Sequence, residues 1–198
     1  VVSSVKFALK AEIAGVNPIV CEGFEAGGHN GREETTTFTL IPMVKEQVKI
    51  PVIAAGGIGS GKGMLAAMVL GADGVQIGSR FAATEESSAH INFKNTIVNV
   101  KDGDTQLTLK ELAPVRLVKN KFFNEVQELY QQNPTIEDIK KLLGRARAKK
   151  GMFEGDLDNG ELEIGQIAGI IHEIKPAKEV FDAIIKEFNE VKALISSI

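Results

Sequence analysis

The sequence contains one cysteine, no tryptophan and no uninterrupted apolar run of about 20 residues, the length of a helix that crosses a membrane. The lone Cys21 excludes an internal disulfide, and its place in a short apolar segment suits a protein of the reducing cytoplasm. The first residues also lack the basic, apolar and small-residue regions of a signal peptide. We therefore expect a cytoplasmic protein without a membrane segment.

An excess of charge of either sign is absent too. The 198 residues carry 23 Lys and Arg against 26 Asp and Glu, and the net charge of -3 argues against a general nucleic-acid binder. There is no Cys-x-x-Cys pair, and His90 and His172 lack neighbours at metal-ligand spacing, so no metal site is expected. With 43% hydrophobic residues, the chain can bury an ordinary core of one or two domains.

Short apolar segments alternate with helix-like segments over the first 80 residues. Residues 1–4 resemble the end of a strand. Further strands are predicted at 19–21, 52–55 and 74–77, and helices at 4–14, after 35–37 and at 62–70. Strands that alternate with helices at this spacing indicate a parallel α/β sheet or barrel.

Two of these strands run directly into glycine turns. Gly56 and Gly57 follow one strand, and Gly78 and Ser79 follow the next. In an α/β barrel, the loops after the last two strands commonly bind phosphate through backbone amides and a helix N-terminus. We predict that these four residues bind a phosphorylated cofactor; the alternative is that the glycines only permit tight turns.

The first of these turns resembles a P-loop but departs from it at the magnesium position. Residues 56–62 fit G-x-x-x-x-G-K, whereas Gly63 replaces the required serine or threonine. Lys62 likewise replaces the third glycine of a dinucleotide fingerprint that would start at Gly57. An ATPase site and a Rossmann-type site are therefore not predicted.

A histidine lies on a third glycine-rich turn, which follows the strand at 19–21. Gly27 and Gly28 offer backbone amides that an anion or a flat ring could approach, and His29 comes next. A lone loop histidine is more often a hydrogen-bonded structural residue than a catalyst. Its position just beyond a strand nevertheless makes His29 the candidate for catalysis.

From about residue 85 the chain becomes polar and then mostly helical up to residue 150, with Thr135 as a candidate helix cap. Residues 140–150 hold six basic and no acidic side chains. This pattern is typical of a solvated helix face, or of a docking surface for an acidic partner or a dinucleotide phosphate. Near the C-terminus, Gly165 would permit close packing, while Gln166 is a weaker candidate for ligand contact.

Four motifs occur in order along almost the whole chain: E-G-F-E-A-G-G-H-N-G at 22–31, I-A-A-G-G-I at 53–58, G-A-D-G-V-Q-I-G-S-R-F at 71–81 and G-Q-I-A-G at 165–169. Together they resemble the nitronate monooxygenase (2-nitropropane dioxygenase) family, which includes the FMN-dependent type II enoyl-acyl carrier protein reductases, the FabK-like branch. The resemblance implies an α/β fold, an FMN-binding TIM (β/α)8 barrel with a helical insertion. Such a barrel takes about 250 residues, and only four strand signals are found, so we expect the C-terminal half of the barrel.

The resemblance also implies a division of the chain and a set of site residues. Residues 1–90 would form half of the barrel, 91–160 a mostly helical inserted lid or substrate domain, and 161–198 the closing barrel helices. His29 would be the active-site histidine. The cofactor would be lined or held by Gly27, Gly28, Gly56, Gly57, Gly78 and Ser79, the last four at the FMN phosphate.

The implied function is oxidation of alkyl nitronates by an FMN-dependent oxidoreductase, with His29 as the base. The near-equal alternative is an enoyl-acyl carrier protein reductase of fatty acid synthesis that uses NADH or NADPH, because residues 85–90, 115–121 and 155–160 resemble that branch. The basic run would then suit an acidic acyl carrier protein, and a homodimer is expected. A noncatalytic protein that binds a phosphorylated ligand is the third hypothesis.

Overall fold

A three-stranded parallel sheet forms the centre of the N-terminal region in the computed structural model, which describes residues 1–196. The strands, in spatial order, are β1 (Ile19–Glu22), β3 (Val52–Ala55) and β4 (Gly74–Gln76). Val2 extends the sheet by a parallel bridge to Cys21. The three strands expected inside the sequence are thus confirmed, and the expected strand end at residues 1–4 is present as this single bridge.

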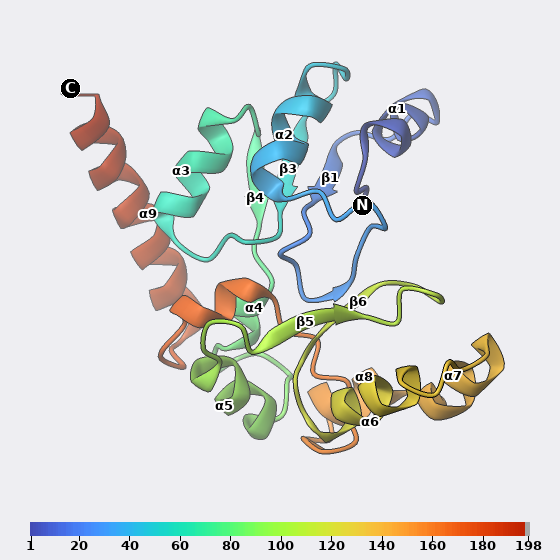
Figure 1. The fold of residues 1–198 in the computed structure, drawn as a ribbon. Coiled ribbons are helices and arrows are strands. Elements are labelled where there is room, and N and C mark those ends of the chain that lie inside the picture. Colours follow the sequence, from blue (N-terminus) through green and yellow to red (C-terminus); the bar gives the residue numbers. More distant parts are fainter. Residues whose placement is uncertain (197–198) are drawn as a thin grey trace.

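Helices cover this sheet, as Figure 1 shows. The helices packed on the strands are α1 (Val5–Ile13), α2 (Thr37–Lys45) and α3 (Gly61–Val69), and α9 (Ala177–Ile195) packs on α3. Aliphatic side chains such as Leu40, Ile41 and Val44 of α2 are fully buried against the strands. The helix α9 packs closely along α3 because Gly61 lacks a side chain; a Cβ there would lie 2.3 Å from the backbone nitrogen of Phe188.

A second sheet is antiparallel, and the sequence pattern did not predict it. Its strands, in spatial order, are β2 (Gly28–His29), β6 (Val115–Val118) and β5 (Thr105–Thr108). Both strands of the β5–β6 hairpin have four residues, and Val115, Arg116 and Leu117 are all buried, so the polar and apolar alternation of a half-exposed strand is missing.

The remaining elements pack against one another or against the antiparallel sheet. They are α4 (Ser79–Ala82), α5 (Ile91–Asn99), α6 (Lys121–Tyr130), α7 (Ile136–Leu143), α8 (Arg147–Met152) and the 3-10 helix η1 (Gln166–Ile170). The predicted cap at Thr135 is confirmed: its hydroxyl accepts from the amide of Asp138, whose carboxylate in turn accepts from the amide of Thr135.

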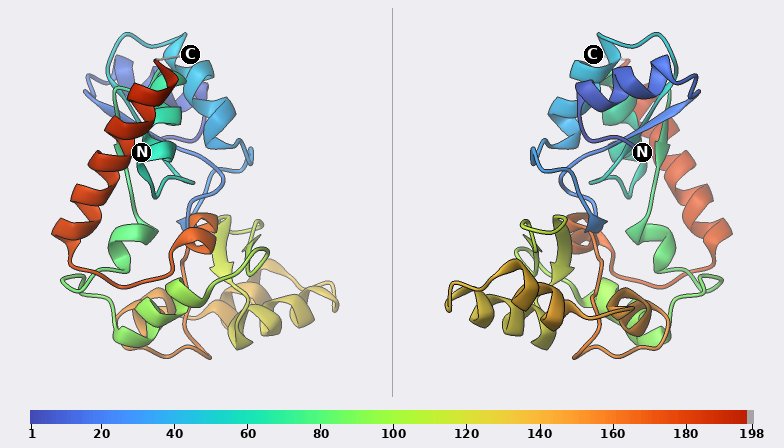
Figure 2. Two further views of the ribbon diagram at one scale, coloured as in Figure 1. Left: turned by 90° about the vertical axis from the view of Figure 1, so that its left-hand side faces the viewer. Right: turned by 90° about the vertical axis from the view of Figure 1, so that its right-hand side faces the viewer.

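Two lobes are visible in Figure 2. We call residues 1–84 and 172–196 the parallel lobe and residues 85–171 the antiparallel lobe. The lobes share structure, because β2 leaves the parallel lobe to pair with β6 of the antiparallel lobe. Among residues 1–196, no helix combines the length and apolar character needed to cross a bilayer.

Candidate cofactor and active site

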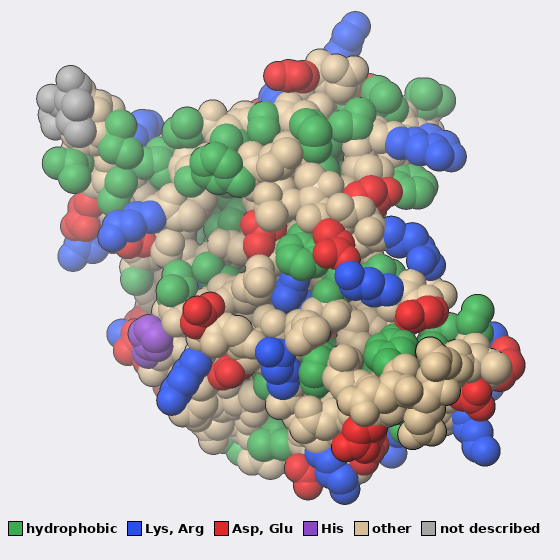
Figure 3. All heavy atoms as spheres, viewed as in Figure 1, with side chains coloured by type: hydrophobic (Ala, Val, Ile, Leu, Met, Phe, Trp, Pro, Cys, Tyr) green, Lys and Arg blue, Asp and Glu red, His purple; other side chains and the backbone are tan. Residues whose placement is uncertain are grey.

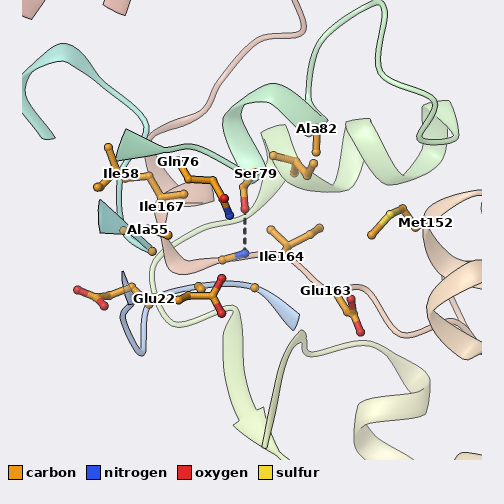
Figure 4. A pocket seen from close by; sticks show the side chains of 18 of the residues that line it. Glu22, Ala55, Ile58, Gln76, Ser79, Ala82, Met152, Glu163, Ile164 and Ile167 are labelled. Atoms are coloured by element: carbon orange, nitrogen blue, oxygen red, sulfur yellow. Dashed lines mark hydrogen bonds between the residues drawn. The ribbon is translucent and has the colours of Figure 1, made fainter. Parts of the chain in front are cut away.

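A cavity of about 250 Å³ opens where β1, β3 and β4 end. The carboxyl ends of parallel strands are where α/β folds bind ligands. Five of the seven predicted site residues line this cavity: Gly27, Gly56, Gly57, Gly78 and Ser79. Figure 4 shows the cavity between the strand ends and the returning segment that carries Glu163 and Ile164.

The turn after β3 places its main chain at the cavity wall. Gly56 and Gly57 have φ of +88° and +67°, values that side chains rarely adopt. A Cβ on Gly56 would also lie 2.8 Å from the carbonyl oxygen of Gly23. Thr37 Oγ1 lies 2.9 Å from the carbonyl oxygen of Gly56 and fixes the turn, whereas the amide of Gly57 donates to no group within residues 1–196.

The turn after β4 presents similar groups. A Cβ on Gly78 would meet nothing within 4 Å, so this glycine borders open space. Ser79 Oγ accepts a 3.1 Å hydrogen bond from the amide of Gly165, the dashed line in Figure 4, and its own proton remains available for donation. In the described part of the chain the amides of Gly78 and Ser79 have no acceptor. Two neighbouring turns therefore offer unpaired donors to the same cavity.

The turn that precedes His29 is held from two sides. The Glu25 carboxylate accepts from the backbone amide of Thr37 at 2.9 and 3.1 Å and so caps the start of α2 from outside the helix. Arg116, which is 1% exposed, donates through Nε and Nη2 to the carbonyl oxygen of Phe24 at 3.1 and 2.8 Å. Its guanidinium also stacks 4.4 Å from the Phe24 ring centroid. Sequence reasoning missed both residues; the partner of Arg116 is 92 residues away in the chain.

Gly27 and Gly165 allow two main-chain segments to touch beside the cavity. A Cβ on Gly27 would lie 2.5 Å from the backbone nitrogen of Gly165. The amide of Gln166 donates to the carbonyl oxygen of Glu25 at 2.9 Å. Gly165 does permit close packing, as expected, but its partner is the turn before His29, whereas packing on a sheet was expected. Gln166 itself is exposed and contributes its backbone.

His29 and Gly28 lie beside the cavity without lining it. The two residues form β2, where the His29 side chain is 73% exposed. Its Nδ1 atom lies 4.0 Å from Oε1 of Glu163, a side chain that is only 18% exposed and does line the cavity. A Cβ on Gly28 would approach Glu163 Oε2 to 3.0 Å. Glu163 thus connects the predicted histidine to the cavity, and no motif in the sequence pointed to it.

Three carboxyl groups around the cavity have raised pKa values. Burial raises the pKa of Glu22, which lines the cavity at the end of β1. Burial also raises the pKa of Glu163, partly offset by the positive charge that His29 can carry. The pKa of Glu161 is raised by burial and by its neighbour Glu163. Such shifts favour the protonated, hydrogen-bond-donating form of these groups.

Three of the six basic side chains at 140–150 form hydrogen bonds or ion pairs within the described residues. Arg147 donates hydrogen bonds to the carbonyl oxygens of Leu143, Asn159 and Leu142. Its Cζ atom lies 4.2 Å from the centroid of the Phe122 ring. Two of the lysines, at 140 and 149, form ion pairs with nearby glutamates. On the face shown in Figure 3, cationic side chains lie interspersed with anionic ones.

Comparison with known proteins identifies the family. The family model described as nitronate monooxygenase matches residues 1–187. The chain belongs to the nitronate monooxygenase family. It is 33% identical over 199 aligned residues to a probable nitronate monooxygenase of Staphylococcus saprophyticus, covering 96% of this chain and 56% of that protein. The chain thus spans little more than half the length of this curated relative.

Two solved structures share the fold of this chain. FabK from Thermotoga maritima superposes with a TM-score of 0.91 and 42% identity, covering all of this chain and 62% of FabK. A nitroalkane oxidase from Streptomyces ansochromogenes gives a TM-score of 0.80 and 28% identity over 98% of this chain and 57% of its own. These likenesses confirm the expected fold class: the described residues supply one side of a TIM barrel, with an insertion.

The cavity suits the phosphate end of a flavin nucleotide. Its donors are the unpaired amides of Gly57, Gly78 and Ser79 together with the Ser79 hydroxyl, and such groups bind anions. Glu25, the carboxylate next to Gly57, already accepts from Thr37 and faces the charge of Arg116. The donor set therefore fits the group that nitronate monooxygenases would bind here.

Proposed function

We propose that the complete barrel containing these residues is an FMN-dependent oxidoreductase, and that the turns after β3 and β4 hold the flavin phosphate. The observation that carries this proposal is the convergence of unpaired amides of Gly57, Gly78 and Ser79 on one cavity at the ends of adjacent parallel strands. Bound FMN would supply hydride and electron transfer, for which protein side chains have no equivalent.

Reduction of enoyl thioesters, with NADH or NADPH as the reductant, is the reaction we favour. The support is the 42% identity to FabK over the whole chain, against 28% to the nitroalkane oxidase. The antiparallel lobe also gives the cavity an apolar wall of Phe93, Ile97, Met152 and Ile164. Such a wall would accept an acyl chain and exclude water from the reacting carbons.

Oxidation of alkyl nitronates is the second candidate. It is supported by the names of the curated relatives and by the nitroalkane oxidase structure. In this reaction His29 would act as a base toward the carbon that bears the nitro group. Its exposed position beside Glu163 leaves the imidazole able to exchange protons with solvent.

An acyl carrier protein is the partner that the reductase would meet. Lys141, Arg145 and Lys150 are the basic side chains of the run that form no ion pair or hydrogen bond within residues 1–196. We propose that these three contact the acidic carrier. Charge-reversal at all three should raise KM for acyl carrier protein substrates and leave KM for small thioesters unchanged.

The decisive experiment follows flavin absorbance in the complete barrel protein under anaerobic conditions. FMN should bind, NADH or NADPH should bleach it, and crotonyl thioester should restore the absorbance. Restoration only by a nitronate with oxygen would select the second candidate. Absence of FMN binding would refute the cofactor assignment, and stable binding of a phosphorylated ligand without turnover would favour the noncatalytic hypothesis.

A further inference from the structure

The apolar wall of the cavity depends on the first turn of α5. Phe93 lies in that turn, is 1% exposed and lines the cavity, and Ile97 lines it one turn further along the helix. Met152, at the end of α8, contributes to the same wall (Figure 4). A group that fixes the start of α5 against the end of α8 therefore positions three wall residues at once.

His90 is that group. Its Nδ1 atom accepts a 3.1 Å hydrogen bond from the backbone amide of Asn92, so the imidazole caps the N-terminus of α5. The His90 amide donates to the carbonyl oxygen of Met152 at 2.8 Å. The side-chain amide of Asn92 donates to the carbonyl oxygen of Gly155 at 3.0 Å, and a Cβ on Gly155 would collide with the imidazole ring. One histidine thus links α5 to the end of α8 and to the loop beyond it.

This cap requires a neutral imidazole. Neutral histidine has one ring nitrogen that donates and one that accepts, whereas both nitrogens of the imidazolium ion donate. Because Nδ1 accepts from Asn92, the ring proton of the capped form is on Nε2. A proton on Nδ1 would face the amide hydrogen of Asn92 and would place a positive charge at the positive end of the helix dipole. Protonation and capping therefore exclude each other.

We propose that His90 is a positioning residue for the acyl chain, and that its protonation releases the first turn of α5 and weakens the binding of long-chain thioesters. The inference rests on the proposed reductase function, because an acyl chain is the ligand that this wall would contact. Histidine is the side chain that ordinarily changes charge between about pH 5 and pH 8. The affinity for long acyl chains should accordingly fall as the pH is lowered through this range.

The charged side chains on the segments packed around His90 do not hold its imidazole. They are Glu85 and Glu86 before it, Lys94 on α5, and Lys149, Lys150, Glu154 and Asp156 on α8 and the following loop. Lys94 donates to a backbone carbonyl oxygen, and Lys149 pairs with Glu154 at 3.3 Å. The carboxylates of Glu86 and Asp156 accept from backbone amides. Within residues 1–196, the bond from Asn92 is the only hydrogen bond or ion pair of the His90 side chain, so its charge state is coupled to the cap.

The first test compares KM values of the complete, FMN-loaded protein from about pH 8 to about pH 5. The measured quantity is KM for a decenoyl thioester divided by KM for crotonyl thioester. This ratio removes pH effects that both substrates share, including those of the cavity carboxyls Glu22 and Glu163. In the wild type the ratio should rise about fivefold at the low end of the range, which is the effect of losing a typical helix cap.

Two substitutions of His90 separate the cap from the titration. His90→Asn supplies a side-chain oxygen that caps helices and does not titrate, so the KM ratio should stay low at every pH. His90→Ala removes the cap, so the ratio should stay high at every pH. The matched control is His172→Asn, a change of a histidine that does not line the cavity, and it should keep the pH dependence of the wild type.

The second test follows hydrogen exchange in the complete protein without substrate. Protection of the amides at 91–99, corrected for the intrinsic effect of pH on exchange, should fall at low pH in the wild type and in His172→Asn. It should stay constant in His90→Asn. The amides of β3 serve as the internal reference, because a loss of overall stability at low pH would affect them as well.

Three results would overturn the proposal: a KM ratio in the wild type that does not change with pH, a His90→Asn protein that keeps the wild-type pH dependence, or exchange in α5 that does not distinguish these two proteins. Retained FMN affinity shows that each variant is folded. Failure of the FMN-loaded wild type to reduce any enoyl thioester would instead refute the proposed function, and the exchange measurement would still report whether His90 caps α5 in a pH-dependent way.

Discussion

The two lobes contribute different groups to the same cavity. The parallel lobe contributes the turns of Gly57 and Gly78, whose unpaired donors suit the phosphate of a cofactor, together with polar side chains such as Glu22 and Gln76. The antiparallel lobe contributes side chains, among them Phe93, Ile97 and Glu163. We propose from this difference a division of labour in which one lobe binds the cofactor and the other contacts the substrate.

The lobes are joined by contacts that tolerate little change. One is the main-chain contact of Gly27 with Gly165, and the other is the bond from buried Arg116 of β6 to the carbonyl oxygen of Phe24. Both bring the turn before His29 against the antiparallel lobe. If the division of labour holds, breaking these contacts should damage both functions together, whereas changes within one lobe should damage only one.

The largest effect is expected for Gly27→Val. A Cβ at position 27 would lie 2.5 Å from the backbone nitrogen of Gly165. The nearest atoms are all main-chain atoms, so no flexible side chain can move aside to relieve the clash. We expect a loss of about 3 kcal/mol or more in the free energy of unfolding, measured by urea titration. Gly169→Ala is the control, since a Cβ there meets nothing within 4 Å and should change stability by less than about 0.5 kcal/mol. Equal stability of the two variants would refute the close approach.

Arg116→Met should cost about 2–3 kcal/mol, because it leaves the Phe24 carbonyl without its buried donor. Arg32 is the matched control: it also donates two hydrogen bonds to carbonyl oxygens across the lobes, at 2.9 Å each, but is exposed. Arg32→Met should cost below about 1 kcal/mol. Comparable losses in the two variants would show that burial of Arg116 is not what makes the junction strong.

Ser79→Ala and Phe93→Leu test the division of labour directly. Loss of the Ser79 hydroxyl should weaken FMN binding about tenfold, near 1.4 kcal/mol, with KM for thioesters unchanged. Ser79→Thr keeps a hydroxyl and should bind FMN normally. Phe93→Leu should raise KM for long-chain thioesters and leave FMN affinity unchanged. If Ser79→Ala raised KM for thioesters, or if Phe93→Leu weakened FMN binding, the lobes would not divide the two tasks.

Glu163→Gln should change how stability depends on pH. A carboxyl group whose pKa is raised in the folded state stabilises the fold fully below its unfolded pKa, and this contribution is lost as pH rises through the folded pKa. Glutamine does not titrate. The stability of the variant relative to the wild type should therefore increase from pH 4 to pH 8, as measured by urea unfolding. A constant difference across this range would contradict a raised pKa.

The sequence predicted the parallel lobe well because each strand, turn and helix there follows from neighbouring residues. Five of seven predicted site residues line the cavity, and they lie on turns that directly follow strands. The β5–β6 hairpin was missed because its buried strands lack an alternating pattern. The positions of Arg116 and Glu163 were missed because their partners are some 90 and 130 residues away in the chain. No local pattern encodes such pairings. The catalytic role of His29 stays a prediction.

Thr135→Ala should have the smallest effect, about 1 kcal/mol, because it removes one side-chain cap of α7. Thr135→Ser retains the hydroxyl and should behave as the wild type. This cap lies in the antiparallel lobe and far from the cavity lining, so hydrogen exchange should quicken in α7 and not in β3. If exchange in β3 quickened equally, the two lobes would unfold as one unit, and their separate contributions to the cavity would not reflect separate stabilities.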